Sequence, residues 1–126
     1  MSYDLAVWYP NRLLADEEAL EQYTRLCNED ISGLEAHLAI DAFYNEIVNI
    51  HPEVDDVPED KIGDFGFSPW SNEHHRSNCH IIMSCVWSHA NHVHDLVFRL
   101  GKKYGLAIFD PQLSKIYYPS GYPEKN

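Results

Sequence analysis

The chain lacks several features that would place it in a familiar class. It has three cysteines, an odd number without the paired spacing of a zinc site, which argues against a disulfide framework of the secreted kind. No apolar run approaches the roughly 18 residues that a membrane helix needs, and no basic stretch followed by an apolar one opens the chain. We therefore expect reduced thiols and a cytoplasmic protein whose mature form begins near Met1.

Positive charge is scarce in the first half of the chain. Residues 1–60 hold fifteen Asp or Glu but only two basic residues, Arg12 and Arg25, which gives a net charge of −13. Residues 61–126 have seven basic and five acidic residues, for a net charge of +2. Such a field repels nucleic acid and anionic membranes, and it attracts a cationic partner from a distance.

Signatures of catalysis are also missing. The sequence has no glycine loop that would cradle phosphate, no nucleophile elbow and no paired-carboxylate motif. A cysteine nucleophile would need Cys79 or Cys85 beside a histidine such as His75 or His80. Both cysteines share one face of an apolar strand, which favours small buried side chains instead. The sequence therefore predicts a protein that is not an enzyme.

The residues that are present predict one folded domain over 1–126. Hydrophobic residues make up 44% of the chain and aromatic residues 13%, which suits one modest core. Apolar periodicity predicts strands at 3–9, 79–87, 106–109 and 115–118, and helices at 16–28, 33–50 and 89–104. The resulting order, β-α-α-β-α-β-β, predicts an α/β (α+β) two-layer sandwich in which about three helices pack on a mixed sheet of four to five strands. Residues 79–109 should form a right-handed parallel crossover, and the tail, 121–126, should be frayed.

Local signals set the predicted helix ends. Asp16 can cap the first helix, and Ser32 with Glu35 has the spacing of a capping box for the second. Pro52 ends the second helix because it disfavours helical geometry in the residue before it. Gly105 is a suitable stop for the third helix.

A long segment, residues 51–78, shows little periodicity. It exceeds the usual connection of about 4–6 residues, and long connections of this kind are usually either functional or disordered. Its composition is unusual, because it begins with Glu53, Asp55, Asp56, Glu59 and Asp60 and ends with Phe65, Phe67 and Trp70.

Three motifs give the chain a resemblance to a group of small, acidic bacterial proteins. They are M-S-Y-D-L-A-V-W at 1–8, V-W-S at 86–88 and G-L-A-I-F-D-P-Q at 105–112. The chain is also similar in size and charge to immunity proteins of contact-dependent and other polymorphic toxin systems. The resemblance implies a protein that binds and neutralises a cognate basic toxin domain, such as a nuclease, without a cofactor.

In that role, the acidic surplus before Lys61 would form one docking surface for the toxin. The carboxylates would come from the second helix or from the long segment, and the aromatic residues would act as anchors. The candidate partner-binding residues are Glu35, Asp41, Glu46, Asp55, Asp56, Glu59, Asp60, Phe65, Phe67 and Trp70. In the alternative interpretation, the carboxylates only solvate a surface and the aromatic side chains hold the segment on the core.

The histidines support a rival hypothesis. Six of the eight lie within 21 residues, at His74, His75, His80, His89, His92 and His94. His89 and His92 are spaced as a ligand pair on a helix, and His80 could approach from the strand to complete a zinc site. The chain would then be a metal-binding domain or a metal-dependent enzyme, although no H-E-x-x-H motif is present. Two further hypotheses are a response to pH near neutrality, where imidazole titrates, and a generic acidic adaptor.

Overall fold

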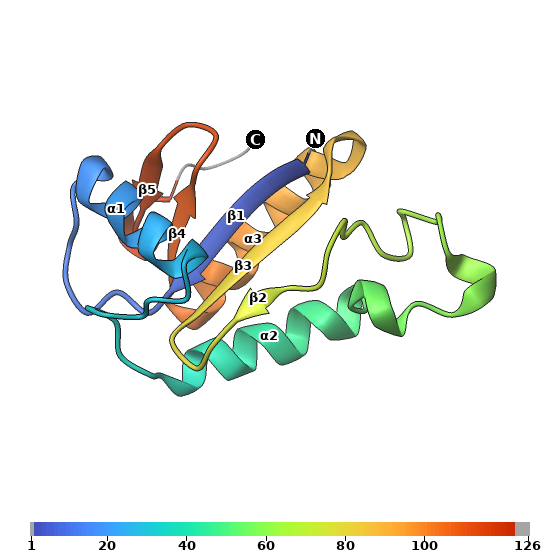
Figure 1. Cartoon of the computed structure of the whole chain (residues 1–126), viewed down its shortest axis with the longest axis horizontal. Coiled ribbons are helices and arrows are strands. Elements are labelled where there is room, and N and C mark those ends of the chain that lie inside the picture. Colours follow the sequence, from blue (N-terminus) through green and yellow to red (C-terminus); the bar gives the residue numbers. More distant parts are fainter. Residues whose placement is uncertain (1, 123–126) are drawn as a thin grey trace.

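The computed structural model describes residues 2–122 and confirms the predicted α+β class and element order (Figure 1). Short 3₁₀ turns at 54–56, 59–61, 87–89 and 119–121 accompany the main elements. These main elements are β1 (Ser2–Trp8), α1 (Asp16–Cys27), α2 (Leu38–Ile50), β2 (His75–Arg76), β3 (His80–Val86), α3 (Ala90–Tyr104), β4 (Ala107–Asp110) and β5 (Lys115–Tyr117).

The five strands of the described chain form one sheet with the order β2-β3-β1-β4-β5. Every neighbouring pair is antiparallel, so the prediction of a mixed sheet is wrong. β3 and β4 run parallel to each other, as the predicted crossover requires, but β1 is inserted between them and pairs with both. The sequence also missed β2, a two-residue edge strand within the long segment.

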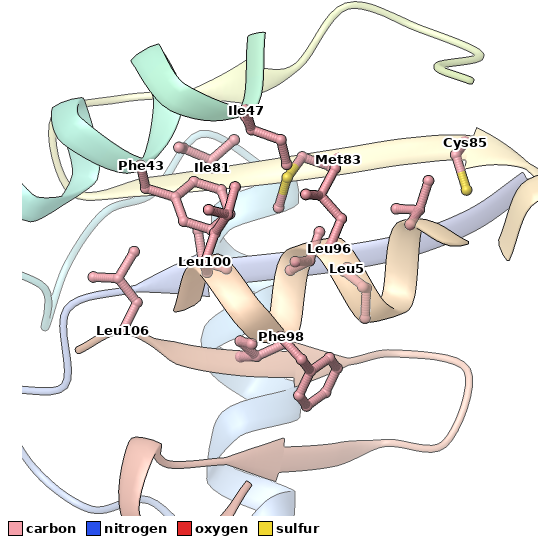
Figure 2. Packing of buried hydrophobic residues seen from close by; sticks show 14 of the residues in the cluster. Leu5, Phe43, Ile47, Ile81, Met83, Cys85, Leu96, Phe98, Leu100 and Leu106 are labelled. Carbon is pink, nitrogen blue, oxygen red and sulfur yellow. The ribbon is translucent and has the colours of Figure 1, made fainter. Parts of the chain in front are cut away.

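Helices cover both faces of the sheet, so the arrangement has three layers where two were predicted. On one face, Leu5 and Val7 of β1 pack with buried residues of α2 and α3 such as Phe43 (Figure 2). On the other face, Ala6 and Trp8 pack with α1. Alternating side chains of β1 thus enter two separate cores, which makes β1 the centre of the structure.

The helix ends follow from local competition for hydrogen bonds. α2 begins at Leu38 rather than at 33, because Ser32 bonds to Asp30 and Gly33 has a φ of +88°. His37 caps α2 instead, since its Nδ1 accepts a hydrogen bond from the Ala39 N–H at 3.0 Å.

The predicted Asp16 cap of α1 is not formed, whereas the predicted Gly105 stop of α3 is confirmed. Ala15 precedes α1 as its N-cap, and the carboxylate of Asp16 accepts a hydrogen bond from the Ile116 N–H of β5 at 3.0 Å instead of capping the helix. Gly105 ends α3 in the left-handed conformation, with a φ of +69°, as predicted.

The described part of the predicted frayed tail is packed. Gly121 closes a 3₁₀ turn, and the Tyr122 ring lies 5.5 Å from that of Phe98 on α3. The prediction of fraying is therefore wrong for these two residues, and 123–126 lie outside the described residues.

Gly101 in α3 offers a test of this packing. Alanine normally stabilises a helix by about 1 kcal/mol relative to glycine. Here a Cβ at position 101 would lie 2.8 Å from the buried Ile108 Cδ1 and 3.0 Å from the Tyr122 hydroxyl. We expect Gly101→Ala to lower the free energy of unfolding by about 1–2 kcal/mol in urea titrations.

Ile108→Val provides the matched control, because it removes the crowding methyl group. The loss caused by Gly101→Ala should be smaller in the Ile108→Val background than in the native chain. Equal losses in the two backgrounds, or a gain in stability from Gly101→Ala alone, would contradict the packing described here.

Candidate functional site

The acidic loop, residues 51–70, is the most distinctive surface feature of the molecule. It projects beyond the carboxyl end of α2, away from β4 and β5 (Figure 1). The tip of the loop is residues 54–66. Two single 3₁₀ turns, Val54–Asp56 and Glu59–Lys61, give this tip a defined shape. Four carboxylates on these turns, those of Asp55, Asp56, Glu59 and Asp60, belong to exposed residues, as expected from the sequence.

The base of the acidic loop is closed by hydrogen bonds at His51. The ring Nδ1 of His51 lies 2.9 Å from the Phe67 carbonyl oxygen, and the Trp70 Nε1–H donates to the His51 carbonyl oxygen at 3.0 Å. The Ser68 hydroxyl donates to the Pro52 carbonyl oxygen at 2.8 Å. The two ends of the loop are therefore joined to each other, and the loop is closed at its base.

A buried carboxylate fixes the loop to the rest of the molecule. Glu53 is only 5% exposed. Its carboxylate accepts hydrogen bonds from the Tyr44 hydroxyl of α2 at 2.8 Å and from the His74 N–H at 3.0 Å. The Arg76 guanidinium stacks 3.8 Å from the centre of the Tyr44 ring. Glu53 thus has a structural role, unlike the exposed carboxylates that follow it.

A tight turn at residues 64–67 follows the second 3₁₀ turn of the acidic loop. The Asp64 carboxylate accepts hydrogen bonds from the Gly66 N–H at 3.1 Å and the Phe67 N–H at 3.2 Å. Gly63 precedes this turn with a φ of +87°, a conformation that favours glycine. Local hydrogen bonds therefore set the path of the tip.

Negative charge is crowded where the acidic loop meets β2. A hydrogen bond with Asp55 and the charges of Asp55, Glu53 and Asp56 raise the pKa of Glu73. A carboxyl group keeps its proton longer when other carboxylates surround it, because like charges repel. A cation brought close to these carboxylates would reduce the repulsion among them.

The candidate residues of α2 do not extend this surface. Glu46 is engaged within the fold, because its carboxylate pairs with the Lys103 Nζ at 2.7 Å and accepts from the Tyr104 hydroxyl. Asp41 is exposed on the first turn of α2, and exposed Glu35 precedes the helix. Both therefore lie at the opposite end of α2 from the acidic loop (Figure 1).

The acidic surplus before Lys61 is consequently not one surface, which corrects the expectation from the sequence. Asp16, Glu17 and Glu18 open α1, which packs on the other face of the sheet from α2. The surplus therefore divides into separate groups of exposed carboxylates, one at Asp16, Glu17 and Glu18 on α1 and another at Asp55, Asp56, Glu59 and Asp60 in the acidic loop.

The three candidate aromatic residues lie in different environments. Trp70 is 2% exposed and belongs to the main core, so it holds the loop on the body of the protein and is not free to contact a partner. Phe67 is half-buried, and Phe65 is 40% exposed. Only Phe65 combines a place on the tip with substantial exposure.

The histidines do not assemble as the zinc hypothesis requires. His80 is buried beside the Ser77 hydroxyl, which lies 2.7 Å from its Nδ1. His92 instead meets His51, with 2.8 Å between their Nε2 atoms. Within residues 2–122, no group of three or more His, Cys, Asp or Glu side chains has the arrangement of a metal site. No local signal in the sequence indicated the His51–His92 contact between α3 and the loop base.

The cysteines are all free thiols, as expected. Burial, with a smaller effect of the Asp4 charge, raises the pKa of the Cys85 thiol to about 12. A thiol of this kind stays protonated near neutral pH and is a poor nucleophile. The Cys79 thiol is buried too and donates to the Asn78 side-chain oxygen at 3.2 Å.

Comparison of the chain with family models, with curated proteins and with solved structures found no match. Among the described residues, no helix has both the length and the apolar character needed to cross a membrane. The assignment of a role therefore depends on the geometry and charge of the acidic loop.

Two buried histidines predict acid sensitivity. Burial lowers the pKa of His74 and of His80 to about 4, from the usual 6.5. Below pH 6.5 the unfolded chain binds protons at both histidines more readily than the folded chain does. The free energy of unfolding is therefore unaffected by these histidines above pH 6.5 and decreases as the pH falls from 6.5 toward 4. Each histidine can contribute a slope of up to about 1.4 kcal/mol per pH unit to the free energy of unfolding.

The variant His74→Phe isolates one of these contributions. Phenylalanine can keep the ring contact with Trp70 while removing the titrating group. Urea unfolding between about pH 7 and pH 4.5 should show a shallower pH dependence for His74→Phe than for the native chain. An unchanged slope in His74→Phe would contradict the role of burial at this site.

Proposed function

We propose that the protein is an immunity protein that binds and neutralises a cognate basic toxin domain in the bacterial cytoplasm. The observation that supports this most directly is the acidic loop, which presents exposed carboxylates on a segment with only one basic residue, Lys61. The whole chain has a net charge of −11, so the long-range field favours a cationic partner as well.

The proposed mechanism is occlusion of the toxin's active site. A toxin that cleaves nucleic acid has a positively charged cleft that binds phosphates. Carboxylates held on a stiff loop can occupy such a cleft in place of the phosphates and exclude the substrate. Charge complementarity speeds association, and contacts near the loop tip then determine the lifetime of the complex.

The three motifs that resemble small acidic bacterial proteins belong to the framework. Residues 1–8 contain the central strand, 86–88 join β3 to α3, and 105–112 contain the C-cap of α3, β4 and the turn after it. They support a shared scaffold, whereas the inhibitory role is inferred from the acidic loop that this scaffold holds.

Co-expression tests the proposed role in cells. If a polypeptide encoded beside this chain is the toxin, its production alone should stop bacterial growth, and production of both proteins should restore it. Colony counts with an empty vector in place of this chain provide the control. Equal survival with and without this chain would contradict the proposal.

Charge reversal tests the surface. Glu59→Lys with Asp60→Lys should lower the association rate with that toxin by about tenfold or more at low salt, and should weaken its salt dependence. Glu17→Lys with Glu21→Lys on α1 changes the net charge equally and serves as the matched control. The same loss in both variants would show that net charge, rather than the acidic loop, determines binding.

A further inference from the structure

The tip of the acidic loop encloses an apolar pocket of about 230 Å³. The side chains of Val54, Val57, Ile62 and Phe65 line it, and buried Trp70 also contributes to its wall. Lys61, Gly63 and Ser68 complete the lining, in which Lys61 is the charged residue. This volume is below the roughly 300–1,000 Å³ that is typical of small-molecule sites. The pocket is therefore suited to one or two side chains of a protein partner.

The lining is left open to solvent to an unusual degree. Ile62 is 73% exposed, Phe65 is 40% exposed and Val54 is 37% exposed. Single exposed apolar residues are common on protein surfaces, but several that share one concave site mark a place for interaction. The hydrogen bonds at the loop base keep the lining together, so binding would cost little reorganisation.

Carboxylates occupy the same two turns as the pocket. Exposed Asp55 and Asp56 directly follow Val54, and exposed Glu59 and Asp60 directly precede Lys61 and Ile62. None of these carboxylates lines the pocket itself, but they flank its lining residues along the chain and are called its rim below. An apolar centre with charged residues next to it has the anatomy of a protein interface in which one anchor residue is buried and ion pairs surround it. The negative rim disfavours nucleic acid, and the apolar lining disfavours a bare cation.

We propose that this pocket receives an apolar side chain of the partner, flanked by lysine or arginine residues that pair with the rim. This inference rests on the proposed function, since it takes the partner to be a basic protein. It goes further because it locates the anchoring contact and states the chemistry of the segment that makes it.

Three capped synthetic pentapeptides test the inference against the ¹⁵N-labelled full chain at low ionic strength. The first has leucine between two pairs of lysines, the second has serine in place of the leucine, and the third has leucine between two pairs of glutamates. The leucine–lysine peptide should shift the amide signals of Val57, Ile62, Gly63 and Phe65. It should bind about tenfold more tightly than the serine peptide, because only leucine buries apolar surface.

Substitution at exposed positions provides the matched variants. Ile62→Ser should reduce the affinity for the leucine–lysine peptide to that for the serine peptide. Leu38→Ser, which changes a residue 81% exposed at the other end of α2, should leave both affinities unchanged. Because both side chains are exposed, neither change is expected to unfold the protein.

The outcomes separate this inference from the proposed function. Equal binding of the leucine–lysine and serine–lysine peptides would overturn the pocket as an anchor site and leave the acidic docking surface standing. Binding of the leucine–glutamate peptide as tight as that of its lysine counterpart would overturn the basic character of the partner segment. Failure of both lysine peptides to bind would overturn the inference, whereas the proposed function fails only if co-expression with the toxin does not restore growth.

Discussion

The closure of the acidic loop at its base is the constraint that holds both the charged surface and the apolar pocket in place. The ring and the carbonyl oxygen of His51 form hydrogen bonds with Phe67 and Trp70, where the chain returns from the tip. Trp70 is buried in the core, and the Glu53 carboxylate accepts hydrogen bonds from Tyr44 and His74. Without these contacts, the acidic loop would lose little buried apolar surface on becoming disordered, because its tip adds few residues to either core. With them, its carboxylates and its apolar pocket keep one arrangement, and a partner need not order them on binding.

The tip itself is not optimised for the stability of the free protein. Carboxylates crowd one another there, as the raised pKa of Glu73 beside Asp55 indicates, and apolar side chains such as Ile62 remain in contact with water. Sites that conflict with local stability are often functional, because the conflict is relieved when a ligand binds. A cationic partner with an apolar anchor would relieve both conflicts at once.

The sequence predicted those parts of the structure that local signals determine. Alternation indicated the two long strands, and Gly105 ended α3 where a left-handed residue was needed. Prediction failed where a residue had a second option, since Ser32 bonds to a neighbouring aspartate instead of capping α2. Local patterns could not show which face of the sheet each helix covers, nor that His51 meets α3. The loop's composition indicated a functional site, yet Phe65 and Trp70 could not be told apart until tertiary packing buried one of them.

Amide hydrogen exchange of the protein, free and in complex with the proposed toxin partner, tests the proposed docking surface most directly, because it maps the contact residues without any substitution. We predict that binding slows exchange at residues 54–66, with little change in α1 and β5. Protection confined to α1 or β5, with the acidic loop exchanging as in the free protein, would contradict the proposed surface.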